Sequence, residues 1–127
     1  MTALITFLTL FFAQNEVELK VSFTGMEHSK GKVLVELRNE KNVVVQSKVL
    51  PVKNEAAYTI FNVLPGKYAV SAFYDANNNT KLDKNFVGAP TEKYGFSNNA
   101  RGTFGPPDFD DQLVEVNKTQ KIDIQLK

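Results

Sequence analysis

Alternation of apolar and polar residues is the main signal in this chain. In residues 17–23 every second residue is apolar and the residues between are polar, which predicts a strand with one buried face. Similar short segments recur, separated by polar turns. The predicted strands are residues 17–23, 32–38, 43–50, 57–63, 67–74, 113–116 and 122–126. Their regular spacing predicts an all-β fold, a single antiparallel β-sandwich of about seven strands with one long ordered loop.

Parity within these strands predicts the core. Apolar residues at strand centres are expected to face inward, and they are Val21, Val35, Ile60, Val70 and Ile124. Residues 67–74 (KYAVSAFY) are apolar on both faces, which favours a central strand. Pro51 is expected to end its strand or to mark a sheet edge, because proline cannot donate a ladder hydrogen bond.

The N-terminus has a different character. Residues 1–13 (MTALITFLTLFFA) are apolar and uncharged, and a polar segment follows at once. The run is shorter than the roughly 20 apolar residues that span a bilayer. It resembles the hydrophobic region of a secretory signal peptide cleaved after Ala13, so we expect residues 14–127 to form one domain that is secreted or periplasmic in a bacterium. The alternative is a buried first strand.

Composition narrows the function classes. The net charge of +1 and the scattered basic residues give no strong field to attract nucleic acid. Cysteine is absent, which removes disulfides, thiol catalysis and thiolate metal sites. The single histidine, His28, lies in a polar turn, and one histidine cannot build a multi-histidine zinc site. We expect His28 to be a solvated loop residue.

One polar segment, the predicted loop at residues 74–112, interrupts the strands. Loops of this length in compact domains are usually functional or disordered, and disordered segments are poor in the aromatic residues found here. Oxygen-bearing groups recur at every second position at its start. They are Asp75, Asn77, Asn79, the Lys81 carbonyl and Asp83. This spacing matches the first part of a calcium-binding loop and predicts a weak Ca²⁺ site, with a Kd of roughly 10⁻⁴–10⁻³ M.

Two positions depart from a calcium-binding loop. Thr80 stands where a glycine is usual, and Phe86 stands where an EF-hand has its bidentate glutamate. The closing carboxylate must therefore come from elsewhere, and we assign it to Asp110 in the acidic cluster at residues 108–111, with Glu92 as a further possibility. The alternative is an Asn-rich surface turn, since Asn and Asp hydrogen-bond their own backbone.

The later part of the loop supplies candidates for a ligand-binding surface. They are Tyr94, Phe96, Asn98, Asn99, Arg101 and Phe104. Amide and guanidinium groups suit a carboxylate, phosphate or sugar ligand. The alternative is that the aromatic rings anchor the loop and the polar groups satisfy its carbonyls.

The segment LPGKYAVSAFYDANNNTKLDKNFVGAPTEKYGFSNNARGTFGPPDFDD resembles the signature of DUF2141, a bacterial family of uncharacterised secreted proteins. The resemblance covers residues 17–127, with departures at Thr80 and Gln112. It implies a β-sandwich at the cell surface or in the periplasm and no established activity. More loosely, the turn and Asp/Asn ladder resemble B-type modules of bacterial adhesins and transthyretin-like or starch-binding-like sandwiches. In the adhesin modules such a loop binds calcium and stiffens the domain.

Three functional hypotheses follow. The first is a non-catalytic, calcium-stabilised module that binds a protein or a glycan. The second is a small hydrolase with carboxylates drawn from Asp75, Asp83, Glu92 and Asp110. Glycosidases need a pair about 5–9.5 Å apart across a cleft, which a domain this small seldom builds, so we expect no enzymatic activity. The third is a purely structural surface protein.

Overall fold

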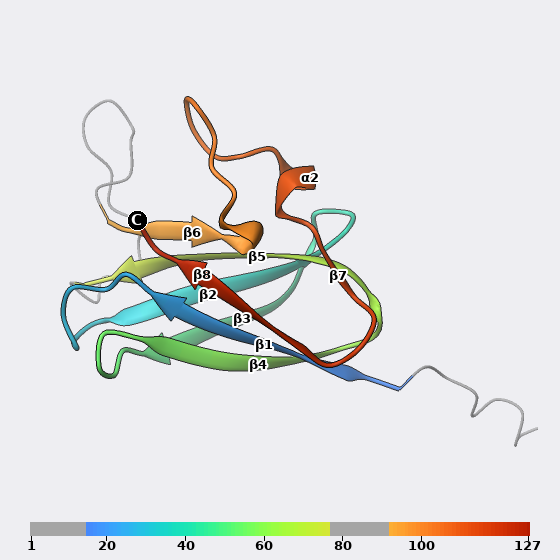
Figure 1. Ribbon diagram of the computed structural model, residues 1–127, viewed down its shortest axis with the longest axis horizontal. Coiled ribbons are helices and arrows are strands. Elements are labelled where there is room, and N and C mark those ends of the chain that lie inside the picture. Colours follow the sequence, from blue (N-terminus) through green and yellow to red (C-terminus); the bar gives the residue numbers. More distant parts are fainter. Residues whose placement is uncertain (1–14, 77–91) are drawn as a thin grey trace, which may run out of the picture.

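The computed structural model describes residues 15–76 and 92–127, which form two packed β-sheets (Figure 1). The predicted signal peptide lies outside the described residues. The elements are β1 (Val17–Thr24), β2 (Lys32–Asn39), β3 (Val44–Pro51), β4 (Ala57–Val63), β5 (Gly66–Asp75), β6 (Tyr94–Phe96), the 3₁₀ turn η1 (Ser97–Asn99), α2 (Phe109–Gln112), β7 (Val114–Val116) and β8 (Gln120–Gln125). No helix in this part of the chain is long and apolar enough to cross a membrane.

The sheets have three and five strands. The smaller sheet has the order β4-β1-β8, and the larger has the order β3-β2-β5-β6, with β7 also paired to β5. The predicted all-β sandwich is therefore confirmed. One pairing departs from the antiparallel prediction, because β1 and β8 run parallel from Leu19 opposite Gln120 to Thr24 opposite Gln125. The reason is that β7 ends at the end of the sandwich where β1 begins, so β8 enters the smaller sheet from there.

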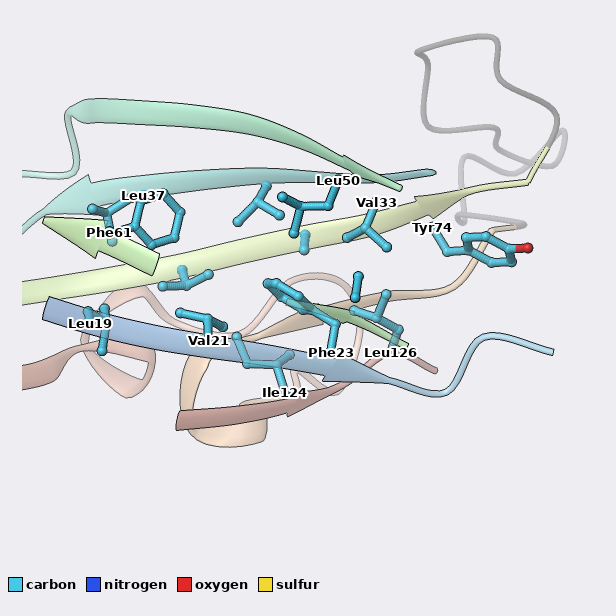
Figure 2. Close-up of a cluster of buried hydrophobic side chains, with 14 of the residues drawn as sticks. Leu19, Val21, Phe23, Val33, Leu37, Leu50, Phe61, Tyr74, Ile124 and Leu126 are labelled. Carbon is cyan, nitrogen blue, oxygen red and sulfur yellow. The ribbon is translucent and has the colours of Figure 1, made fainter. Parts of the chain in front are cut away.

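The inward side chains of both sheets form one core (Figure 2). Its fully buried members include Leu19, Val21, Phe23, Val33, Val35, Leu37, Phe61, Val70, Val116 and Ile124. Among the predicted core residues, Ile60 was assigned to the wrong face. It is only half-buried, because β4 turns Thr59 and Phe61 inward. Both parities of this strand carry apolar residues, so its alternation alone does not select the buried face.

Strand β5 is the centre of the larger sheet, as predicted. It pairs with β2 on one side and with β6 and β7 on the other. The short strand β6 was missed by the sequence analysis because it lies inside the predicted loop. β3 is an edge strand that ends at Pro51, in agreement with the expectation for that proline.

Different contacts close the two sides of the sandwich. On one side, the backbones of Tyr94 and Lys127 exchange hydrogen bonds of 3.2 and 3.0 Å, which link β6 to the end of the chain beyond β8. On the other side, Lys48 Nζ donates to the Ile60 carbonyl (2.6 Å) and Gln46 Nε2 to the Asn62 carbonyl (3.0 Å). These side chains cover carbonyls of the edge strand β4, which reduces its tendency to pair with another chain.

Candidate functional site

The predicted calcium ligands begin at the end of β5. Asn77, Asn79, Lys81 and Asp83 lie outside the described residues, so the site itself stays a prediction. Asp75, the last residue of β5, is fully buried. Lys32 lies opposite it on β2, with Nζ 4.0 Å from Asp75 Oδ2. Asp75 is thus a buried carboxylate beside a cation at the end of β5, and removing that cation would leave an uncompensated buried charge.

Glu92 lies beside the same strand end. The Ala76 amide donates a 3.1 Å hydrogen bond to Glu92 Oε2, which places this carboxylate one residue along the chain from Asp75. The neighbouring turn is held by Tyr74, whose phenol donates to the Lys30 carbonyl at 2.5 Å. Burial raises the pKa of the Tyr74 phenol, so it remains a donor at neutral pH. Glu92 is therefore the described acid best placed to join Asp75 in a metal site.

The turn between β1 and β2 also contacts Lys93, the residue just before β6. Lys93 Nζ lies 2.9 Å from Glu27 Oε1 and donates to the Gly25 carbonyl at 2.7 Å. The hydrogen bond from Lys93, and then its positive charge, lower the pKa of the exposed Glu27 carboxyl. His28 is exposed in the same turn, consistent with the solvated position expected for it.

Asp110 lies elsewhere. It is on α2 and borders an open hollow with Glu40, Lys67 and Glu115, near the first residues of β5. Lys67 precedes Asp75 by eight residues of strand, a distance of about 26 Å at about 3.3 Å per residue. The structure therefore does not bring Asp110 to Asp75. Within residues 15–76 and 92–127, no three His, Asp or Glu side chains form a group that could hold a metal ion.

The polar members of the proposed ligand surface make structural contacts. Asn98 donates its amide to the carbonyls of Asp111 (3.1 Å) and Leu113 (3.0 Å). Asn99 accepts a 2.9 Å hydrogen bond from the Gln125 amide. Both asparagines have positive φ, at 62° and 49°, a conformation that asparagine tolerates better than most residues. Their contacts fix the turn after β6, which is the alternative role considered for them above.

The aromatic members form a different feature. Tyr94 and Phe96 pack edge to face with ring centroids 5.8 Å apart. The guanidinium of Arg101 lies over the Tyr94 ring at 4.7 Å and donates to the Tyr94 carbonyl at 2.7 Å. These contacts hold the Tyr94 ring at the edge of the larger sheet, where a cation–π contact contributes about 0.5–1 kcal/mol.

Both rings border an open hollow of about 460 Å³ on the outer face of the larger sheet. Register explains its lining, because residues directly opposite each other in a sheet project from the same face. One row crosses four strands and consists of Val49, Leu34, Phe73 and Tyr94. The adjacent row consists of Ser47, Glu36, Ser71 and Phe96. An apolar row thus lies beside a row of hydroxyl and carboxylate groups that ends in an aromatic ring.

Phe104 does not line this hollow. It is fully exposed in the segment between η1 and α2. The structure therefore separates the six predicted surface residues into rings that line a hollow, polar groups that support a turn, and one projecting phenylalanine.

One protein-family model matches most of this chain. Residues 21–124 match the model of DUF2141, described as an uncharacterized protein conserved in bacteria. The chain belongs to the DUF2141 family. A comparison with curated proteins gave no match. The matched span of this DUF2141 domain includes the Asp75 strand end, the hollow and Phe104.

Of the residues that line the hollow in this DUF2141 domain, sequence reasoning selected Tyr94 and Phe96 and missed the others, including the large apolar residues Leu34, Val49 and Phe73. A signal for them was present. Leu34 lies on the outward parity of KVLVELR, and Phe73 on the outward parity of KYAVSAFY. An apolar residue on the solvent side of a strand indicates a binding surface when neighbouring strands place other apolar residues beside it. The strand register decides which residues lie side by side.

Proposed function

We propose that this protein is an exported, non-catalytic binding module that recognises a glycan through the outer face of its larger sheet. The observation that carries the proposal is the hollow in which Tyr94, Phe96 and Phe73 lie beside Ser47, Ser71 and Glu36. The outer face of the smaller sheet differs. There Ser22 and Asp123 are joined by a hydrogen bond, and Lys20 lies opposite Lys121.

Glycan chemistry fits such a hollow. A pyranose ring presents C–H groups on its faces and hydroxyl groups around its edge. The C–H faces pack on aromatic rings, while the hydroxyl groups need hydrogen-bond partners at the rim. Binding sites are commonly concave and mostly apolar, with a few placed polar groups. The Tyr94 ring is held by Arg101 before any ligand arrives, so little side-chain entropy is lost on binding.

The carboxylates favour binding over hydrolysis. Glu36 is the acidic side chain among the residues that line the hollow, and its Oε1 lies 2.8 Å from Arg38 Nη2. A glycosidase mechanism uses two carboxyl groups about 5–9.5 Å apart across the substrate. Of the four acids that the alternative hypothesis invokes, Asp110 lies near the opposite end of β5 from Asp75, and Glu92 lies beside Asp75 but does not line the hollow. The fourth, Asp83, lies outside the described residues. This arrangement supports a non-catalytic role.

The test is titration with defined β-1,4-linked hexasaccharides of glucose and of N-acetylglucosamine, and with soluble peptidoglycan fragments. Binding is followed by residue-resolved NMR shifts and by calorimetry. We expect shifts at Leu34, Phe73 and Phe96, and about two- to tenfold weaker binding for Phe96→Ala, since an aromatic contact contributes about 0.5–1.5 kcal/mol. Tyr58→Ala is the matched control, because Tyr58 is an exposed aromatic residue on β4 in the other sheet. Equal affinities of the two variants, or no binding of any of these glycans, would contradict the proposal.

Export and calcium belong to the same proposal. The apolar, uncharged residues 1–13 support removal of a signal peptide after Ala13. Mass spectrometry of the protein from the periplasm or medium of an expressing bacterium checks this, and an intact N-terminus contradicts it. Calcium would bind the Asp/Asn ladder that begins at Asp75, with Glu92 replacing Asp110 as the closing carboxylate. Its role would be to stabilise the segment that follows β5.

A further inference from the structure

The lining of the hollow gives a direction to a chain that binds there. One uncharged row of side chains crosses four strands, and it consists of Val49, Leu34, Phe73 and Tyr94. Along the two central strands, charged residues interrupt the outer face. On β2, Lys32 and Glu36 flank Leu34, and on β5, Asp75 lies two residues after Phe73. The continuous apolar track therefore runs across the sheet rather than along its strands.

Ion pairs border this row on both sides. On one side, Lys32 Nζ lies 4.0 Å from Oδ2 of the buried Asp75. On the other side, Glu36 Oε1 lies 2.8 Å from Arg38 Nη2. A neutral sugar chain laid along the strands would cover these pairs and offer no charge in exchange for the lost water, which is unfavourable. A chain laid across the strands covers uncharged side chains and leaves the ion pairs at its edges.

The row has the length of a short stretch of glycan. Neighbouring strands lie about 4.8 Å apart, so a row across four strands is about 14 Å long. One sugar unit of an extended β-1,4-linked chain is about as long as one interstrand spacing, so about three units fit on the row. The adjacent row, with Ser47, Glu36 and Ser71, runs parallel to the first and can hydrogen-bond to the hydroxyl groups along one edge of the same chain.

A chain that continues past Tyr94 leaves the larger sheet, because β6 is the last strand of that path in the part of the chain that the structure describes. The segment between η1 and α2 projects beyond β6 (Figure 1). We name residues 102–106 the Phe104 loop. Arg101, directly before this loop, lies over the Tyr94 ring at 4.7 Å and donates to the Tyr94 carbonyl. The Phe104 loop thus begins at the Tyr94 end of the row.

The tip of the Phe104 loop presents a whole aromatic ring to solvent. Phe104 is 101% exposed. The base of the loop is closed, since a Cβ on Gly102 would collide with the Gly105 carbonyl oxygen, and the loop ends at the buried Pro107. Phe104 follows Arg101 by three residues, a span of at most about 11 Å, or about two sugar units. The ring is therefore preorganised within reach of a sugar chain that extends past Tyr94.

We propose that the ligand of the outer face is a linear glycan that crosses the strands of the larger sheet along the apolar row and continues past β6, where Phe104 stacks on a further sugar unit. This inference rests on the proposed function, and it adds the direction of the chain, its minimum length and one further contact. The site selects extended chains of more than about three units over short oligosaccharides, because short ones reach the sheet but not Phe104.

Calorimetric titration with ligands of different lengths tests the proposal. The probes are disaccharides, trisaccharides and hexasaccharides of β-1,4-linked glucose, of β-1,4-linked N-acetylglucosamine and of the peptidoglycan glycan strand. We expect Phe104→Ala to weaken hexasaccharide binding by about two- to tenfold, the effect of one aromatic contact, and to leave trisaccharide binding unchanged. Phe104→Tyr, which keeps the ring, should restore the hexasaccharide affinity. Phe96→Ala should weaken both ligands, and Tyr58→Ala, in the other sheet, should weaken neither.

Backbone NMR shifts give the direction of the chain. Shifts that appear with the hexasaccharide but not with the trisaccharide should lie in the Phe104 loop. If they lie instead at Lys32 or Arg38, the chain runs along the strands and the proposal is overturned. A hexasaccharide that binds equally to the unmutated chain and to Phe104→Ala also overturns it, while a loss of affinity in Phe96→Ala would still support the proposed function. Absence of binding by every one of these glycans contradicts both proposals.

Discussion

Removing the Ser97 hydroxyl tests how the sandwich holds the turn that follows β6. Ser97 is fully buried at the start of η1. Its Oγ accepts a 2.9 Å hydrogen bond from the Val70 amide of β5 and donates a 2.5 Å hydrogen bond to the Gln112 carbonyl of α2. One hydroxyl therefore joins three elements and satisfies a buried strand amide at the point where β6 ends.

The magnitude follows from these two contacts. Ser97→Ala leaves the Val70 amide buried without an acceptor, and an unsatisfied buried group costs about 1–3 kcal/mol. The Gln112 carbonyl loses a donor as well. We expect a total loss of about 2–3 kcal/mol in the free energy of unfolding. For a domain of this size, about 4 °C of melting temperature corresponds to 1 kcal/mol, so the melting temperature should fall by roughly 8–12 °C.

The assay is urea denaturation and thermal unfolding of the purified protein, followed by circular dichroism. Ser29→Ala is the matched control, because the Ser29 hydroxyl also accepts a backbone hydrogen bond, from Glu55 at 3.1 Å, but at an exposed position. Water can replace that hydroxyl, so its loss should cost less than about 1 kcal/mol. If the two variants lose the same stability to within about 0.5 kcal/mol, burial does not set the strength of the Ser97 contact and the reasoning is refuted.

Three other predictions concern the core, a backbone contact and the metal. Val35→Asp should abolish cooperative unfolding, because an unpaired buried charge costs several kcal/mol. The control Val49→Asp, on the exposed side of β3, should remain folded. A soluble Val35→Asp protein that unfolds cooperatively would show that the buried face was misassigned. Gly95→Ala should lower the free energy of unfolding by about 1–3 kcal/mol through overpacking, since the new Cβ would lie 2.8 Å from a backbone oxygen. In the control Gly66→Ala, the new Cβ meets nothing closer than 3.6 Å. Similar denaturation midpoints for the two variants would contradict this prediction. Calcium at about ten times its Kd should raise the free energy of unfolding by about 1.4 kcal/mol relative to chelator. Asp83→Ala should lose that gain. An equal gain with magnesium at the same ionic strength would count against a calcium site.

The sequence alone determined the strands and most of the core. Period-two alternation is a local property, because each side chain's face is set by its position in a pleated strand. It located β1 to β5, β7 and β8 and predicted that Val21 and Val35 would be buried. It failed where the local signal was ambiguous. β6 has only three residues, and β4 has apolar residues on both faces, which misplaced Ile60.

The candidate site depended on contacts between distant segments. Asp75 and Phe96 could be selected by residue type, but residue type does not reveal which groups meet. Register between four strands assembled the hollow. The length of β5 separated Asp110 from Asp75, while one hydrogen bond brought Glu92 to the same strand end. Local pattern fixes which face a side chain takes, whereas strand order and register fix its neighbours, and these arise only when the two sheets bury their apolar faces together.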